Sequence, residues 1–107
     1  MVSYTISKEL TIYDALVQIE SNRQRSLIVL DNNNFVCGTL SDGDIRRALI
    51  NKVLIDVKIK NVMNLDFIFV YEDASEHEIN DKLENGDVFI LPQIDEQQKL
   101  LKIHMVE

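Results

Sequence analysis

Hydrophobic and polar positions follow two different periods along the chain. Apolar side chains between Ile12 and Ile19 stand three and four residues apart, which predicts an amphipathic helix that ends near Asn22. Short apolar runs with polar flanks predict strands at residues 4–6, 26–30 and 35–40. The segment Asp31–Asn34 separates the last two runs, and Asn and Asp tolerate the backbone of tight turns. These two strands are therefore expected to form a hairpin.

The same order of predicted strands and helix occurs twice along the chain. A shift of 64 residues places Thr11 on Ser75, two residue types that cap helix N-termini, and Asp31 on Asp95. The second copy predicts strands at 67–71, 88–91 and 99–105, with a helix after Ser75 and a turn at 94–98. Only Ile79 and Leu83 mark the apolar stripe of that helix. Pro92 lacks an N–H and suits a strand edge or a bulge.

The two copies divide the chain into residues 1–52 and 62–107. The first copy continues into another helix from about Asp42 to Lys52, whose buried face includes Ile45, Ala48 and Leu49. The second copy has no room for this helix, because Glu107 falls on the position of Gly43. Residues 53–62 contain no Gly, Ser or Pro and are expected to pack against the domain. The fold class expected is α/β (α+β), with two β-α-β-β-α units packed pseudo-symmetrically through their sheets and the second truncated.

Composition narrows the possible partners. The chain has 107 residues and is 46% hydrophobic, which is typical of one globular domain. No apolar run approaches the roughly 20 residues that span a bilayer, so no membrane is expected as a partner. A net charge of −7 argues against nucleic acid as the main partner. The single cysteine, Cys37, is expected to be a buried strand thiol in a cytoplasmic protein.

The segment from Gly38 to Arg47 carries the candidate chemistry. A strand ends there and a helix begins, and the free N–H groups of a helix N-terminus suit a phosphate. Ser41 could donate its hydroxyl to a phosphate, and Gly43 would let the backbone approach closely. Arg46 or Arg47 could add positive charge. These residue types together suggest a phosphorylated ligand.

Two carboxylates in this segment leave alternatives open. Asp44 would repel a phosphate but could accept hydrogen bonds from both hydroxyls of a ribose, which points to a nucleotide. In a simpler interpretation Ser41 or Asp42 caps the helix, Gly43 permits the turn and the arginines are solvated. Asp42 and Asp44 alone offer too few oxygen ligands for a hard cation, and no metal is expected.

The segment from Gly38 to Leu49 resembles the signature of the cystathionine-β-synthase-type (CBS) domain, and the whole chain resembles a tandem pair of such domains, often called a Bateman module. Asn61–Asn64 at the opening of the second copy and the run Leu91–Asp95 fit the same pattern. The resemblance implies clefts between the two units for adenosine nucleotides. In that family the Ser/Thr contacts phosphate and the following Asp contacts ribose, roles that fall on Ser41 and Asp44.

The resemblance implies further expectations about ligand and partners. The strand residues expected to contact the base are Thr5, Ile6, Leu27 and Ile28. In the second copy, Lys102 and Met105 replace the glycine and serine of the motif, so at most one competent site is expected. AMP, ADP or ATP is the expected regulatory ligand, and no cofactor is required. The alternative is a degenerate pair that serves only dimerisation and assembly.

The expected role is regulation without catalysis. The form of the motif resembles CBS pairs that precede a sugar-phosphate nucleotidyltransferase domain, which implies a C-terminal catalytic domain in the parent chain. No Ser-His or Cys-His pairing indicates an enzyme in this segment. CBS pairs commonly form homodimers through their helices. The candidate contact residues are Ile12, Leu16, Ile45 and Leu49, although packing in the core explains them equally well.

Overall fold

The computed structural model describes residues 3–86 and 88–106. Helices and strands follow the order predicted from the repeat. They are β1 (Thr5–Ser7), α1 (Ile12–Asn22), β2 (Ser26–Leu30), β3 (Val36–Ser41), α2 (Asp42–Ile50), the 3-10 turn η1 (Ile59–Asn61), β4 (Val70–Tyr71), α3 (Glu76–Asn85), β5 (Ile90–Ile94) and β6 (Leu100–Met105). The chain thus forms one complete β-α-β-β-α unit, a connector, and a second unit that lacks the last helix within the described residues.

Each unit contains a three-stranded sheet with the same topology. The orders are β1-β2-β3 and β4-β5-β6, and in both sheets the first pair is parallel and the second antiparallel. The register also repeats, because Ser26 pairs with Ser41 and Ile90 pairs with Met105. Both hairpins even shift register at the equivalent point, between Val29 and Leu30 and between Gln93 and Ile94. The predicted fold and its 64-residue repeat are therefore confirmed.

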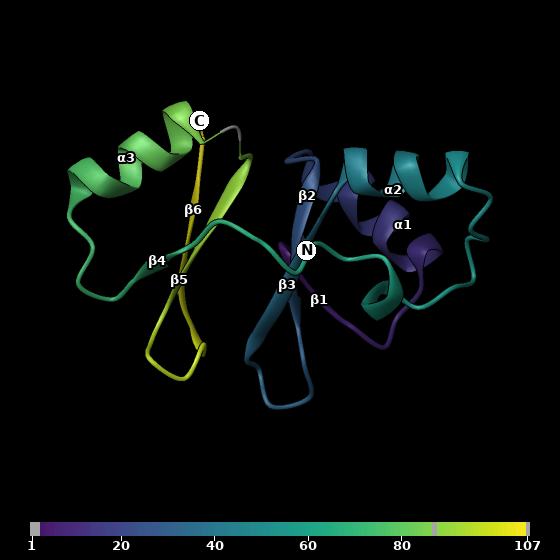
Figure 1. Cartoon of the computed structure of the whole chain (residues 1–107), viewed down its shortest axis with the longest axis horizontal. Coiled ribbons are helices and arrows are strands. Elements are labelled where there is room, and N and C mark those ends of the chain that lie inside the picture. The colour runs from purple at the N-terminus through teal and green to yellow at the C-terminus, as the bar shows by residue number, and fades with distance from the viewer. Residues whose placement is uncertain (1–2, 87, 107) are drawn as a thin grey trace.

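The two sheets pack against each other, and the helices lie on their outer sides (Figure 1). One apolar core lies between the first sheet and helices α1 and α2, and it includes Leu27, Leu40 and Ile59. A second, smaller core lies between the sheets and joins Ile28 and Val36 of the first unit to Ile90 and Ile94 of the second. Near it, the N–H of Val36 donates to the carbonyl of Gln98 at 2.8 Å. The two units therefore meet through a packed apolar interface.

Capping residues position the helices as predicted. The Thr11 hydroxyl accepts from the Asp14 N–H at 3.2 Å, while the Asp14 carboxylate accepts from the Thr11 N–H at 2.9 Å. This reciprocal arrangement satisfies two backbone donors that a helix start leaves free. The hydrogen bonds from the Thr11 backbone and side chain lower the pKa of Asp14 below its usual value. Ser75 caps α3 with one hydrogen bond, by accepting from the Glu78 N–H at 3.1 Å.

Replacing Thr11 with alanine should lower the free energy of unfolding by about 1 kcal/mol, because the first turn of α1 loses its cap. Urea denaturation at pH 7 measures this loss. Asp14 stabilises the folded state above its unfolded pKa of about 3.9, and this contribution disappears as the pH falls through its lowered folded pKa. The difference between the Thr11→Ala and native proteins should therefore shrink below pH 4. A constant difference down to pH 2 would contradict this account.

The structure decides several expectations about individual residues. Ile12 and Ile45 are 0% and 2% exposed, so of the two explanations left open, core packing holds, whereas Leu49, expected on the buried face of α2, is 41% exposed. Pro92, expected at a strand edge or a bulge, lies in β5, the central strand of its sheet, next to the shift in register between Gln93 and Ile94. This position is tolerated because β4 is only two residues long and pairs with Gln93 and Ile94, so no β4 residue pairs with Pro92.

The connector packs against the first unit, as predicted. The N–H of Ile12 donates to the carbonyl of Val57 at 3.0 Å, and Ile59 is fully buried. After η1, the chain turns back along β3, where Thr39 and Asn64 exchange two backbone hydrogen bonds of 3.1 and 2.8 Å. This contact brings the start of the second unit beside the end of β3.

Candidate functional site

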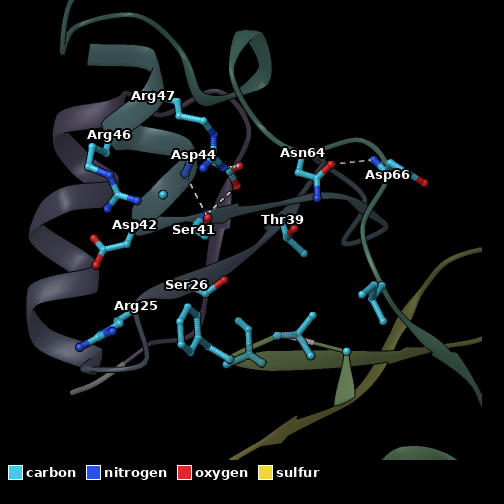
Figure 2. A pocket seen from close by; sticks show the side chains of 16 residues that line it. Arg25, Ser26, Thr39, Ser41, Asp42, Asp44, Arg46, Arg47, Asn64 and Asp66 are labelled. Atoms are coloured by element: carbon cyan, nitrogen blue, oxygen red, sulfur yellow. Dashed lines mark hydrogen bonds and ion pairs between the residues drawn. The ribbon is translucent and has the colours of Figure 1, made fainter. Parts of the chain in front are cut away.

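A pocket of about 460 Å³ lies between the two units at the N-terminus of α2 (Figure 2). This volume is within the range of small-molecule sites. Three parts of the chain form its walls: the first unit, the connector and the second unit. The lining residues are Arg25, Ser26, Thr39, Ser41, Asp42, Gly43, Asp44, Arg46, Arg47, Asn64, Asp66, Ile68, Gly86, Val88, Phe89 and Ile90.

Ser41 and Asp44 form a second reciprocal cap at the start of α2. The Ser41 oxygen accepts from the Asp44 N–H at 3.1 Å, and Asp44 Oδ2 accepts from the Ser41 N–H at 2.9 Å. Asp44 Oδ1 accepts from Arg47 Nη2 at 2.8 Å. Capping therefore accounts for part of this motif, as the simpler interpretation expected. It leaves the hydroxyl hydrogen of Ser41 free to donate, and each carboxylate oxygen of Asp44 has a further lone pair.

Two arginine side chains converge on the backbone at Gly43. A Cβ placed on Gly43 would lie 3.1 Å from Arg47 Nη1 and 3.6 Å from Arg46 Nη2. The absence of a side chain at this position thus leaves the first turn of α2 accessible beneath two guanidinium groups. The helix dipole and the two guanidinium groups favour an anion at this point, although the N–H groups of Asp42 and Asp44 are already bound within the protein.

A third arginine comes from the loop before β2. The carbonyl of Arg25 accepts from the Asp42 N–H at 2.8 Å, which holds this loop against the start of α2. The backbone of Arg25 has a φ of 61°, an uncommon value for a residue other than glycine. Its guanidinium lies 5.8 Å from the ring centroid of Phe89, so Arg25 contacts the second unit as well.

The rest of the pocket is less basic and more apolar. Val88, Phe89 and Ile90 of the second unit form an apolar wall, together with Ile68, which precedes β4 in the same unit. Asn64 and Asp66 lie on the side of the pocket opposite Arg25 and Arg46 (Figure 2). Asn64 Oδ1 accepts from the Asp66 N–H at 3.0 Å, which leaves the Asn64 amide group free to donate. The pocket therefore has a basic side, a carboxylate in the middle and an apolar wall.

Six of the predicted site residues line this pocket and four do not. Those that line it are Ser41, Asp42, Gly43, Asp44, Arg46 and Arg47. The other four, Thr5, Ile6, Leu27 and Ile28, lie on β1 and β2, outside the lining residues. Leu27 and Ile28 are fully buried, since β2 is the central strand and both of its faces are covered, and Ile6 of β1 is 5% exposed and belongs to the core of the first unit.

The sequence-based prediction missed the residues that other segments bring to the pocket. Arg25 and Phe89 were not predicted, although a signal existed, because they occupy equivalent positions of the repeat just before β2 and β5. Asn64 was recognised as the opening of the second copy but not as a wall of the site. Its position depends on the backbone pairing with Thr39, which no local pattern in the sequence indicates.

The equivalent position of the second unit has different chemistry. Met105 occupies the place of Ser41 and ends β6, while Lys102 occupies the place of Gly38 and is exposed. Within residues 3–86 and 88–106, no group of three His, Cys, Asp or Glu side chains could hold a metal ion. In the same part of the chain, no helix has the length and apolar character required to cross a membrane.

Comparisons with known proteins agree with this architecture. Residues 2–51 match the family model of the CBS domain. An uncharacterised protein of Helicobacter pylori strain J99 is 31% identical over 99 residues, which cover 92% of this chain and 30% of that protein. The chain therefore spans less than a third of the length of that relative.

Two solved structures share the fold at low sequence identity. The CBS domain protein PAE2072 from Pyrobaculum aerophilum, complexed with AMP, superposes with a TM-score of 0.79 at 15% identity, covering 98% of this chain and 81% of that one. The CBS domain pair of protein MJ0100, in complex with 5-methylthioadenosine and S-adenosyl-L-methionine, gives a TM-score of 0.78 at 18% identity, with coverages of 96% and 81%. The chain thus has the fold of a tandem CBS domain pair, and its residues 2–51 match the model of the CBS domain.

Proposed function

We propose that this chain is a regulatory module that binds an adenosine nucleotide in the pocket between its two units. The observation that carries the proposal is the convergence of Ser41, Asp44 and two arginines on the accessible start of α2, inside a pocket with walls from both units. The AMP complex of a structural relative supports the choice of ligand class. Catalysis by this chain is not part of the proposal.

The layout of the pocket suggests how a nucleotide would lie. A phosphate would occupy the space near Gly43, where Arg46 and Arg47 and the Ser41 hydroxyl can all donate to it. The ribose would lie next to Asp44, whose carboxylate oxygens can accept from its hydroxyl groups. The base would then rest against the apolar wall that includes Phe89.

Regulation would follow from the position of the pocket. A ligand that contacts both units stabilises the relative arrangement in which both walls are correctly placed. An attached domain that prefers one arrangement would respond to this change in population. The sequence predicts that this attached domain is a sugar-phosphate nucleotidyltransferase. This stays a prediction, because none of the relatives named above is called a nucleotidyltransferase.

The test is a thermal-shift titration with AMP, ADP, ATP and S-adenosylmethionine on the native chain and on Asp44→Ala. A nucleotide at 100 times its dissociation constant should stabilise the native protein by about 2.7 kcal/mol. Asp44→Ala should weaken binding at least about tenfold, since it removes the carboxylate expected to accept from the ribose.

Asp14→Ala is the matched control. Asp14 and Asp44 hold the same position in the caps of α1 and α2, but only Asp44 lines the pocket. Both variants should lose stability from a broken cap, and only Asp44→Ala should lose the response to nucleotide. No shift of the native chain with any of the four compounds would refute the proposed function. An equal response of the two variants would refute the assignment of the site.

A second candidate function, assembly through the helices, is favoured by the exposed apolar residues of α1 and α2. Tyr13, Val17 and Ile50 are 56%, 52% and 70% exposed, and all three belong to these two helices. Burial of such side chains in a symmetric dimer would remove apolar area from water. Dimerisation does not require a ligand. The pair would therefore assemble in the same way whether it also binds a nucleotide or serves only assembly.

Sedimentation equilibrium of the native chain and of Ile50→Asp tests assembly. The native chain should form a dimer, and a carboxylate at position 50 should weaken it at least about tenfold, because an unpaired charge would be desolvated in the contact. Leu65→Asp is the control, since Leu65 is 72% exposed but lies in the connector. A monomeric native chain, or an equal effect of both substitutions, would contradict assembly through these helices.

A further inference from the structure

The pocket contains more guanidinium groups than one phosphate requires. Arg46 and Arg47 already converge on Gly43 at the start of α2, and Arg47 also donates to Asp44. Arg25 is a third lining arginine, and it comes from a different segment, the loop before β2. Figure 2 shows Arg25 and Arg46 on the same side of the pocket, with Asp42 between them.

The charges on this side are only partly compensated within the protein. Among the described residues, Arg47 has an ion pair, with Asp44, whereas neither Arg25 nor Arg46 has a carboxylate within 4.0 Å. Asp42 is the single acidic side chain between these two arginines in the pocket lining. The whole chain has a net charge of −7, so a side of the pocket that holds two arginines and one carboxylate differs from the average of the surface.

The partner that Arg25 does have is a weak one. Its guanidinium lies over the exposed ring of Phe89, at 5.8 Å from the centroid, and this contact can be exchanged for a charge-assisted hydrogen bond. The backbone of Arg25 is held in place meanwhile, because its carbonyl accepts from the Asp42 N–H. A ligand phosphate could therefore recruit the side chain without movement of the loop.

We infer that the ligand carries at least two phosphate groups and that Arg25 distinguishes it from a nucleoside monophosphate. This inference rests on the proposed function and deepens it. The first phosphate lies near Gly43, between Arg46 and Arg47, and Arg25 donates to the second phosphate in the fork geometry that suits a phosphate. A nucleoside monophosphate has a single phosphate to bind three lining arginines, and S-adenosylmethionine has none.

Isothermal titration calorimetry with AMP, ADP and S-adenosylmethionine, at one ionic strength and without magnesium, tests the inference. The native chain should bind ADP at least about tenfold more tightly than AMP, as expected for one more charge-assisted contact. Arg25→Gln should reduce this ratio to about twofold or less and change the affinity for AMP by less than about threefold, because the inference assigns Arg25 to the second phosphate alone.

Arg23→Gln is the matched control. Arg23 lies in the same loop, is exposed and also has a positive φ of 59°, but it does not line the pocket. It should leave the ratio of ADP to AMP affinity unchanged. Arg25→Lys keeps the positive charge but lacks the planar guanidinium group. Its ratio of ADP to AMP affinity should lie between those of the native chain and Arg25→Gln. This variant also tests the inference if Arg25→Gln does not fold.

The outcomes separate this inference from the proposed function. If AMP and ADP bind the native chain with equal affinity, nucleotide binding stands and the role of Arg25 is overturned. If Arg25→Gln weakens AMP and ADP equally, Arg25 contacts the first phosphate or the ribose, and the inference is again wrong. If none of the compounds binds the native chain, the proposed function itself fails.

Discussion

Replacing Ile28 with alanine should lower the free energy of unfolding by about 2–5 kcal/mol, the range observed for large-to-small changes in packed cores. Ile28 is fully buried at the centre of β2 and contributes to the apolar core between the two sheets. Its partners Ile90 and Ile94 come from the other unit, so the cavity left by the substitution would lie in the interface. For a domain of this size, the melting temperature should fall by at least about 8 °C.

Urea denaturation of the native chain, Ile28→Ala and Leu65→Ala measures this effect. Leu65 is 72% exposed and lies outside the proposed dimer contact, so its truncation should change the free energy of unfolding by less than about 0.5 kcal/mol. The comparison isolates burial from the size of the truncation, since both variants lose the same number of carbon atoms. A loss below 1 kcal/mol for Ile28→Ala would mean that the two sheets do not share a tightly packed core.

Replacing Gly38 with alanine should cost about 1–3 kcal/mol, the usual cost of added atoms in a filled interior. A Cβ on Gly38 would lie 2.9 Å from the carbonyl oxygen of Asn64 and 2.9 Å from Met63 Sδ. The Met63 side chain can shift, but the backbone of Asn64 is held by its pairing with Thr39. The substitution should therefore displace the connector from β3, and with it one wall of the pocket.

Gly43→Ala is the control for this prediction. A Cβ there would meet only the flexible ends of Arg46 and Arg47, and alanine is a better helix former than glycine by roughly 0.8–1 kcal/mol. Thermal unfolding should show a loss for Gly38→Ala and a small gain or no change for Gly43→Ala. Equal effects would mean that β3 and the connector are not in close contact. With a nucleotide present, the melting temperature of both variants should rise less than that of the native chain. Gly38→Ala would displace a wall of the pocket, and Gly43→Ala would place a methyl group at the start of α2.

Much of the fold could be predicted because the responsible interactions are local in sequence. The caps at Thr11, Ser41 and Ser75 depend on residues three positions apart, and all three hydrogen bonds are present. The repeat supplied a second test of each element, and β2 and β5 correspond residue by residue. Where one copy was less regular, as in the helix after Ser75, the other copy indicated the same element.

The errors concern residues whose surroundings come from distant segments. The pattern of α1 and α2 identified an apolar face but not which of its residues the sheet would cover. Ile12 and Ile45 are buried, whereas Leu49 remains exposed. Likewise the missing N–H of Pro92 indicated a strand edge or a bulge, but the short length of β4 beside it allows Pro92 to lie in the central strand.

The sequence by itself determined the order of elements, the internal repeat and the half of the site contributed by residues 38–47, because caps, turns and periodicity act over a few residues. Only the tertiary structure decided the other half. Arg25, Asn64 and Phe89 reach the pocket because two sheets pack through Ile28, Val36, Ile90 and Ile94 and because the connector pairs with β3. Such contacts join residues far apart in the chain, and their free energy depends on the geometry of the whole molecule rather than on local sequence.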